Sequence, residues 1–290
     1  MLNLTIEKMT YGIDSLSHHN GKVVFVPYGA PGDQVEVEIT DEKPDFIRTN
    51  ITKIIQPSPL RRESPCPHFP ECGGCHWLHM PGETQRQEKE AYLKFLMRPL
   101  NPGRLYPLEA LPENGYRNKM DLKIRVEENG KIVLGNYRFR SHDVVAMTHC
   151  RVQCAPNMEL YRHLHTFLTD KPDRARAIDQ ISARTLGSQQ HATVFLKDAP
   201  VEERINDWRA FFDATSTLSK LEILHGNAIC LTLMREQPPF TFMNRPWTVS
   251  PRSFFQNNLE GAEAIYYTLQ SLYDGPPIKG KFIDLYCGIG

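Results

Sequence analysis

The sequence has no long hydrophobic run and no excess of charge of one sign. No stretch approaches the ~18 uncharged apolar residues that a membrane-spanning helix needs. The first eight residues lack the basic and apolar regions of a secretory signal. We therefore expect a cytosolic (cytoplasmic) protein without membrane contact. The 34 basic residues are balanced by 34 acidic ones, so composition argues against indiscriminate nucleic-acid binding, which usually needs a basic excess.

The charge is nevertheless unevenly distributed along the chain. Residues 1–60 contain 5 basic and 8 acidic residues, whereas residues 117–140 contain 7 basic and 3 acidic ones. Because Lys and Arg side chains contact and neutralise phosphates, the second stretch is the better candidate for a surface that binds RNA.

The 290 residues allow two or three domains. Residues 2–57 read as short strands separated by Gly, Pro and Asn turns, which favours a small OB-like β-barrel. A Pro-rich linker follows, and a helix is expected over 83–98. Alternating strands over 119–146, helices near 157–169 and 201–213, and strands near 178–186, 191–197 and 220–234 indicate an α+β region. A further helix is expected over 257–273.

The seven cysteines include three within ten residues, Cys66, Cys72 and Cys75, spaced C-x5-C-x2-C. Clustered thiolates repel one another, so this loop predicts a cation that neutralises them. Gly73 and Gly74 let the backbone approach the sulfurs. A fourth soft ligand must come from elsewhere, and Cys150 or Cys154 are the nearest candidates.

The spacing does not decide which metal this loop holds. An iron–sulfur cluster and a structural zinc site are equally acceptable, the latter with His68, His76 or His149 as a ligand. Buried or oxidised cysteines are the less expected alternative. The C-x3-C-x2-C loop of radical enzymes is absent.

The last residues form an apolar strand that runs into a glycine-rich turn, Phe282-Ile-Asp-Leu-Tyr-Cys-Gly-Ile-Gly290. Open α/β sheets present a first strand to a nucleoside cofactor in this way. Taken alone, this segment fits an ordinary strand and turn equally well.

The order of several motifs is more specific than any one of them. The barrel is followed by CPHFPECGGCHWLH, GYRNKMDL, LGNYRFRSHDVVAMTHCRV, SFFQNN and DLYCGIG. Over residues 3–290 this order resembles the RNA (uracil-5-)-methyltransferase family, in particular its TRAM-containing iron–sulfur members that act on 23S ribosomal RNA.

The resemblance implies a multi-domain fold and two cofactors. It implies a TRAM-like β-barrel at 1–58 and a central α+β domain at 59–250, whose helix 83–98 would pack on the catalytic domain. The beginning of a Rossmann-like methyltransferase domain is implied at 251–290. The cofactors are a [4Fe-4S] cluster and S-adenosyl-L-methionine. By motif, the cluster ligands would be Cys66, Cys72, Cys75 and Cys150.

The resemblance also assigns roles around the reacting base. Gln256 and Tyr286 match positions that contact S-adenosylmethionine, and Phe254 matches an aromatic residue that stacks in the RNA-bound site. Arg117 and Lys119 match part of the RNA-facing surface. Each has a simpler interpretation: Phe254 and its neighbour Phe255 as core, Gln256 as a capping or turn residue, and the two cations as a solvated face.

The family methylates uridine C5 after a cysteine thiolate adds at C6, and a general base then removes the C5 proton. Both groups lie downstream of the DLYCG motif in the family, so we expect no catalytic residue in this chain and no activity of the chain alone. Cys287 belongs to the cofactor motif. The partner expected is structured RNA, with no DNA. The alternative functions are a non-catalytic RNA-binding module, a transfer-RNA uridine C5-methyltransferase, and a structural protein stabilised by a zinc ion.

Overall fold

The computed structural model describes residues 1–103, 105–250 and 252–273. The chain divides into two compact units, with the boundary between Ala110 and Leu111. The three-domain division expected from the sequence stays a prediction. Among the described residues, no helix is long and apolar enough to cross a membrane.

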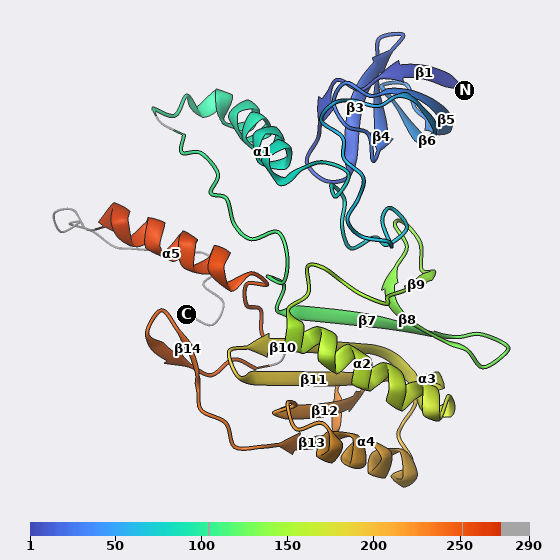
Figure 1. Cartoon of the computed structure of the whole chain (residues 1–290), viewed down its shortest axis with the longest axis vertical. Helices are drawn as coiled ribbons and strands as arrows, with labels where there is room; N and C mark the ends of the chain where they lie inside the picture. Colours follow the sequence, from blue (N-terminus) through green and yellow to red (C-terminus); the bar gives the residue numbers. More distant parts are fainter. Residues whose placement is uncertain (104, 251, 274–290) are drawn as a thin grey trace. The chain divides into compact units, whose positions relative to one another are not determined.

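The first unit begins with a six-stranded sheet in the order β1-β5-β6-β4-β3-β2 (Figure 1). The chain after β1 turns onto β3, where Glu7 N donates to Leu16 O over 2.9 Å, so the sheet closes into the expected small barrel. Alternate residues such as Val35 and Val37 point inward, because successive strand residues face opposite sides. The strands are β1 Leu2–Thr5, β2 Lys8–Met9, β3 Asp14–His19, β4 Lys22–Pro27, β5 Gln34–Glu42 and β6 Phe46–Gln56.

A long loop and one helix complete the first unit. Residues 57–81 contain no helix or multi-residue strand and include the three clustered cysteines. Helix α1 follows at Gly82–Met97 and continues into the 3-10 turn η1 at Arg98–Leu100. The helix expected over 83–98 is thus confirmed within a residue at each end.

The second unit is built on a seven-stranded sheet in the order β13-β12-β11-β10-β7-β8-β9. Only the β11–β12 pair is parallel among these neighbours, because a helix connects those two strands. The strands are β7 Lys119–Val126, β8 Ile132–Tyr137, β9 Val144–Ala146, β10 Ile178–Leu186, β11 Gln189–Leu196, β12 Lys220–His225 and β13 Ala228–Met234.

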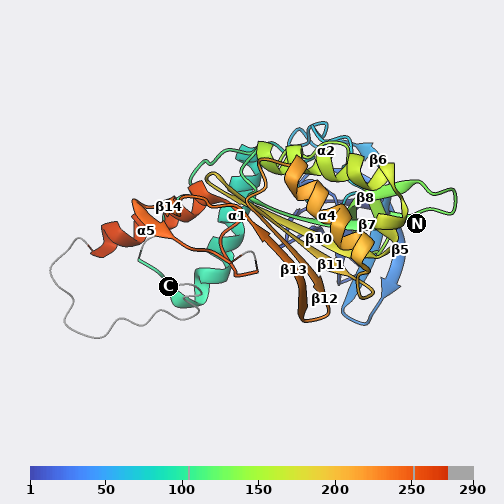
Figure 2. The same ribbon diagram turned by 90° about the horizontal axis from the view of Figure 1, so that it is seen from below.

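Helices cover one face of this sheet (Figure 2). They are α2 Ala155–Asp170, the short α3 Asp173–Arg176 and α4 Glu202–Ala214. The core between helices and sheet includes Trp208 and Leu164, both fully buried. Strand residues on this face are apolar, as with Ile181 and Ala183 of β10. The opposite face of the central strands carries polar residues, among them Arg184 of β10 and Lys119 of β7.

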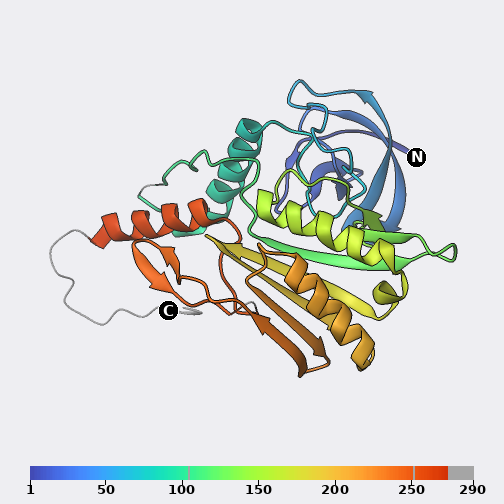
Figure 3. The ribbon, with the colours of Figure 1, turned by 60° about the horizontal axis from the view of Figure 1, so that its bottom comes forward.

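A hairpin and a helix form a second, smaller apolar cluster in this unit (Figure 3). The hairpin consists of β14 Phe240–Phe242 and β15 Arg245–Trp247, and the helix is α5 Leu259–Tyr273. Phe240, Phe242 and Val249 are buried against Leu186 of β10. The sequence did not predict this hairpin. Its two turn residues, Met243 and Asn244, have positive φ angles of 50° and 59°.

Candidate functional site

Aromatic contacts hold the cysteine loop against the barrel of the first unit. The ring of Phe69 stacks on His79 with 5.5 Å between centroids and meets Tyr28 edge-on at 5.3 Å. Trp77 donates its indole N–H to the carbonyl of Gly12. The loop therefore rests on the barrel at several points, although it has no regular secondary structure.

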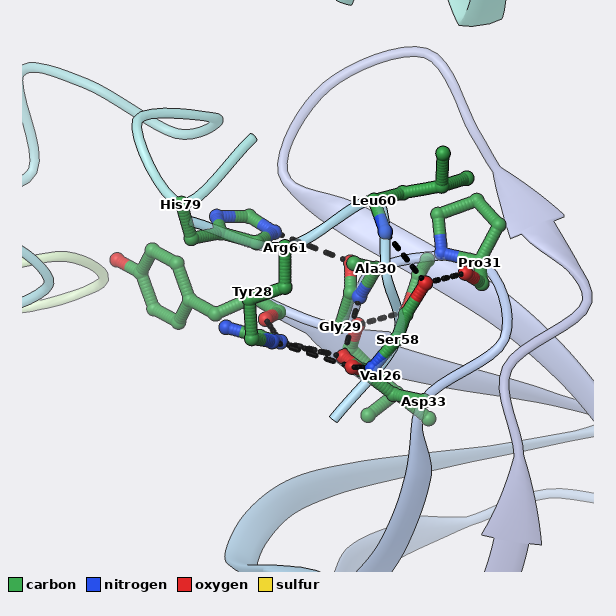
Figure 4. A network of polar contacts seen from close by, with 11 residues as sticks. Val26, Tyr28, Gly29, Ala30, Pro31, Asp33, Ser58, Leu60, Arg61 and His79 are labelled. Atoms are coloured by element: carbon green, nitrogen blue, oxygen red, sulfur yellow. Dashed lines mark hydrogen bonds and ion pairs between the residues drawn. The ribbon is translucent and has the colours of Figure 1, made fainter. Parts of the chain in front are cut away.

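A buried carboxylate fixes the chain where it enters this loop (Figure 4). Asp33 is fully buried and accepts hydrogen bonds from Ala30 N (2.7 Å), Ser58 N (2.8 Å) and Arg61 Nε (3.1 Å). The Arg61 guanidinium also donates to Tyr28 O over 2.8 Å. Asp33 follows Pro31 and Gly32, a turn sequence that carries no functional signal, and the fold makes it the centre of a polar network.

The same network shifts the pKa values of Asp33 and His79. Burial acts to raise the pKa of Asp33, but hydrogen bonds from Arg61, Ser58 and Ala30 and the Arg61 charge hold it below its usual value. Burial and then the Arg61 charge lower the pKa of His79 to about 4. The imidazole, 3.2 Å from the carbonyl oxygen of Gly29, is therefore neutral at pH 7.

The three clustered cysteines are half-buried and lie on tight turns. Phe69 N donates to Cys66 O over 3.2 Å, and Cys72 N donates to His68 O over 2.8 Å. Three thiols on one anchored loop have the donor chemistry that an iron–sulfur cluster needs.

The structure leaves the cluster itself a prediction. Within residues 1–103, 105–250 and 252–273, no group of three His, Cys, Asp or Glu side chains is placed to hold a metal ion. Cys150, the fourth predicted ligand, belongs to the second unit, where it packs against the hydrophobic core.

In the second unit, two of the motifs quoted above lie side by side. The backbone N–H of Asn118 donates to Asn257 O, and its side-chain Nδ2 donates to Gln256 O, both over 2.9 Å. Arg117 forms an isolated antiparallel bridge with Asn258. The fold thus joins segments 116–119 and 253–258, which are about 138 residues apart.

The adjacent phenylalanines of the second motif have opposite environments. Phe254 is 72% exposed. Phe255 packs edge-on against Phe240 and Phe242, with centroids 5.8 and 5.4 Å away. The interpretation as core therefore holds for Phe255 and is wrong for Phe254. The next residue, Gln256, is exposed.

The two predicted cations lie on the strand entry beside this segment. Arg117 is half-buried and donates its Nε to Lys119 O over 3.1 Å. The ammonium of Lys119 is 3.2 Å from the carboxylate of Asp121, and both side chains are about one-third exposed. Both cations are accessible to solvent.

The sequence analysis did not identify two charged residues of the sheet that contact the segment carrying Phe254. Arg184 of β10 is only 4% exposed and donates Nη1 to Ser253 O over 2.9 Å. Burial lowers its pKa, against the opposing charge of Asp121. Glu222 of β12 is also buried; it pairs with Lys220 at 2.8 Å and lies 3.9 Å from Arg252. The available signal was a charged residue alternating with apolar ones along a strand, as Arg184 does with Ala183 in β10 and Glu222 does with Leu221 and Ile223 in β12.

Several expectations fall outside the described residues. The apolar strand expected within residues 282–290, Tyr286 and Cys287 lie there, as do residues 251 and 274–290 of the predicted Rossmann-like domain. The assignment of Tyr286 to the cofactor site stays a prediction.

Comparison with known proteins gives three findings. Residues 2–49 match the TRAM domain family. The chain is 29% identical over 298 residues to an RNA methyltransferase of Aquifex aeolicus, covering 100% of this chain and 67% of that protein. It is 26% identical over 295 residues to the 23S rRNA (uracil(1939)-C(5))-methyltransferase RlmD of Pectobacterium atrosepticum, covering 100% of this chain and 64% of the relative.

Among solved structures, the fold resembles the tRNA (uracil-54, C5)-methyltransferase of Pyrococcus abyssi in complex with S-adenosyl-L-homocysteine. The TM-score is 0.67 at 19% identity, covering 94% of this chain and 65% of that one. The chain spans about two thirds of the length of these relatives. Along nearly its whole length it is therefore similar to RNA methyltransferases.

Proposed function

We propose that this chain acts in S-adenosylmethionine-dependent methylation of uridine C5 in RNA, with 23S ribosomal RNA as the substrate. One observation of the fold carries the proposal: segments 116–119 and 253–258 are hydrogen-bonded together, and the second carries the exposed ring of Phe254 while the first carries two solvent-accessible cations. The TRAM match and the names of the relatives point to the same chemistry.

Each side chain then has a physical task. Phe254 offers a flat apolar face to an unstacked base, an interaction of ~1–3 kcal/mol per base. Phe255, packed against Phe240 and Phe242, anchors it. Arg117 and Lys119 contact phosphates, which fixes the RNA without reading its sequence.

When bound, S-adenosylmethionine supplies the methyl group, and we assign Gln256 and Tyr286 to its pocket. C5 of uracil needs prior attack by a nucleophile to become reactive, followed by removal of a proton. We assign neither of these two catalytic roles to a described residue of this chain.

The function is tested by the binding of RNA and of S-adenosylmethionine to this chain. We expect binding of 23S ribosomal RNA fragments that Phe254→Ala weakens, with no comparable binding of DNA. RNA binding without S-adenosylmethionine binding would favour the RNA-binding module. Binding of transfer RNA in preference to ribosomal RNA would contradict the assignment of ribosomal RNA as the substrate. Absence of RNA binding would refute the proposal.

We also propose that Cys66, Cys72, Cys75 and Cys150 bind a [4Fe-4S] cluster, supported by the thiolate chemistry of the loop and by the resemblance of its motif. Anaerobic purification should yield a brown protein with about four irons per chain. Cys72→Ser and Cys150→Ser should each lose iron. Cys230→Ser, on the exposed edge strand β13, is the matched control. Zinc without iron, or iron retained in both ligand variants, would contradict the assignment.

A further inference from the structure

The segment that carries Phe254 is fixed on both sides of this residue, although the Phe254 ring itself is exposed. Before it, Ser253 O accepts a hydrogen bond from Arg184. After it, Gln256 O accepts one from Asn118. The backbone is therefore held at two carbonyl groups three residues apart, with the aromatic side chain between them.

The Arg184 contact comes from the sheet. Arg184 lies directly across from His191 on β11 and from Lys119 on β7, on the sheet face opposite the helices. Its side chain reaches the Ser253 carbonyl over 2.9 Å. A neighbouring contact supports the same stretch, because Arg252 lies 3.9 Å from the buried carboxylate of Glu222.

The Asn118 contact is equally buried. Asn118 is 3% exposed and donates to this segment from both its backbone and its side chain, over 2.9 Å in each case. The backbone carbonyl oxygen of Asn118 accepts a hydrogen bond from the backbone N–H of Thr185 over 2.8 Å, and Thr185 is next to Arg184 on β10. Both contacts are thus built on the same end of one strand.

These two residues are poorly explained as stabilisers of the fold. Among the described residues, the Nε atom of Arg184 and the Oδ1 atom of Asn118 are buried without a hydrogen-bond partner. Burying a cation or an unsatisfied polar atom costs free energy, and an apolar residue of similar volume would often be as stable or more so. What an apolar residue cannot provide is a donor aimed at the carbonyl groups of Ser253 and Gln256.

We propose that Arg184 and Asn118 are positioning residues that hold residues 253–256 so that Phe254 is presented for stacking on an RNA base. This inference rests on the proposed function and deepens it. Phe255 serves as the apolar anchor of the same segment, and Phe254 makes the contact with the base. A preorganised aromatic ring loses less conformational entropy on binding.

The first experiment is a double-mutant cycle on RNA affinity, with Arg184→Met and Phe254→Ala singly and combined. Loss of one stacked base at ~1–3 kcal/mol corresponds to about 5- to 150-fold weaker binding. We expect Arg184→Met to weaken binding within this range, and to add less than about 2-fold once Phe254 is alanine. Equal losses in both backgrounds would overturn the inference, because Arg184 would then act on RNA independently of Phe254.

Two further variants control this cycle. Arg209→Met removes the same charge from an exposed position of α4 on the opposite side of the sheet, and should change affinity less than about 2-fold. Asn118→Asp keeps the side-chain shape but loses the Nδ2 donor, and should behave like Arg184→Met. Arg184→Lys, which keeps a donor, should recover part of the affinity. Thermal unfolding confirms that each variant is folded.

The second experiment does not depend on RNA. With 4-fluorophenylalanine at position 254, the fluorine NMR signal should be a single narrow line in the otherwise native protein, and split or broadened in Arg184→Met and Asn118→Asp. An unchanged spectrum in both folded variants would refute the positioning role. If the native chain fails to bind RNA, the proposed function fails, whereas this spectrum still decides whether Arg184 and Asn118 position Phe254.

Discussion

Replacing Asp33 by asparagine removes the negative charge at the centre of the polar network that joins the barrel to the cysteine loop. Asp33 is fully buried and the Arg61 side chain is 16% exposed, so the substitution leaves a largely desolvated guanidinium without its counter-charge. Breaking a buried ion pair in this way costs ~3–5 kcal/mol. Because Arg61 keeps some contact with water, we expect the lower end, ~3 kcal/mol, or about 150-fold in the opening equilibrium.

Limited trypsin digestion measures this effect locally, because Arg61 and Arg62 lie at the exit from the network. When opening and closing are fast, the cleavage rate follows the population of the open state. We expect cutting at these arginines to accelerate about 150-fold in Asp33→Asn, because the network loses ~3 kcal/mol.

Asp41→Asn is the matched control for this experiment. Asp41 is 43% exposed and pairs with Lys43 at 3.2 Å, an arrangement worth less than ~1 kcal/mol. If the Asp33 and Asp41 variants are cut at the same rate, the carboxylate of Asp33 does not hold this loop, and the reasoning from burial is wrong.

Three further perturbations test other parts of the fold. His79 has a folded pKa of about 4 against an ordinary 6.5, so its contribution is full above pH 6.5 and is lost as pH falls towards 4. Chemical unfolding should show that the free energy of unfolding falls by on the order of 3 kcal/mol over this pH window, and this pH dependence should be absent in His79→Gln. In Gly135→Ala, the new Cβ would lie 1.9 Å from Val145 O, and we expect destabilisation of ~1–3 kcal/mol in thermal unfolding. The Asp207 carboxylate accepts a hydrogen bond from Arg174 at 2.9 Å, which lowers the pKa of Asp207. In urea unfolding, Asp207→Asn should lower the free energy of unfolding by ~1–3 kcal/mol at pH 7. Below the pKa of the folded carboxylate the same substitution should have little effect.

Much of the secondary structure was readable from the sequence because hydrophobic periodicity marks it directly. Strand β10 begins and ends where the pattern predicted, at Ile178 and Leu186. Helix α5 starts at Leu259, two residues after the expected start. The β14–β15 hairpin escaped prediction because its strands have three residues each and Pro246 lies inside the second, where proline normally argues against a strand.

The site was only partly readable. The motifs identified Phe254, Gln256, Arg117 and Lys119, and the fold brings their two segments together. Asn118 lies between Arg117 and Lys119 but was not predicted as a site residue, because a neutral side chain gives no electrostatic indication of RNA binding. Tyr286 lies outside the described residues, and no structural contact tests its role.

The sequence by itself determined which segments become strands and helices, since these depend on local periodicity and turn residues. It also determined the donor chemistry of the cysteine loop, because thiols at such spacing are explicit in the residue order. Only the tertiary structure decided that Phe254 is exposed while Phe255 packs partly buried against the hairpin, and that Arg184 and Asp33 are desolvated. Those properties depend on contacts between residues far apart along the chain, such as Arg184 with Ser253 and Asp33 with Arg61, and local sequence patterns do not encode which distant partners meet.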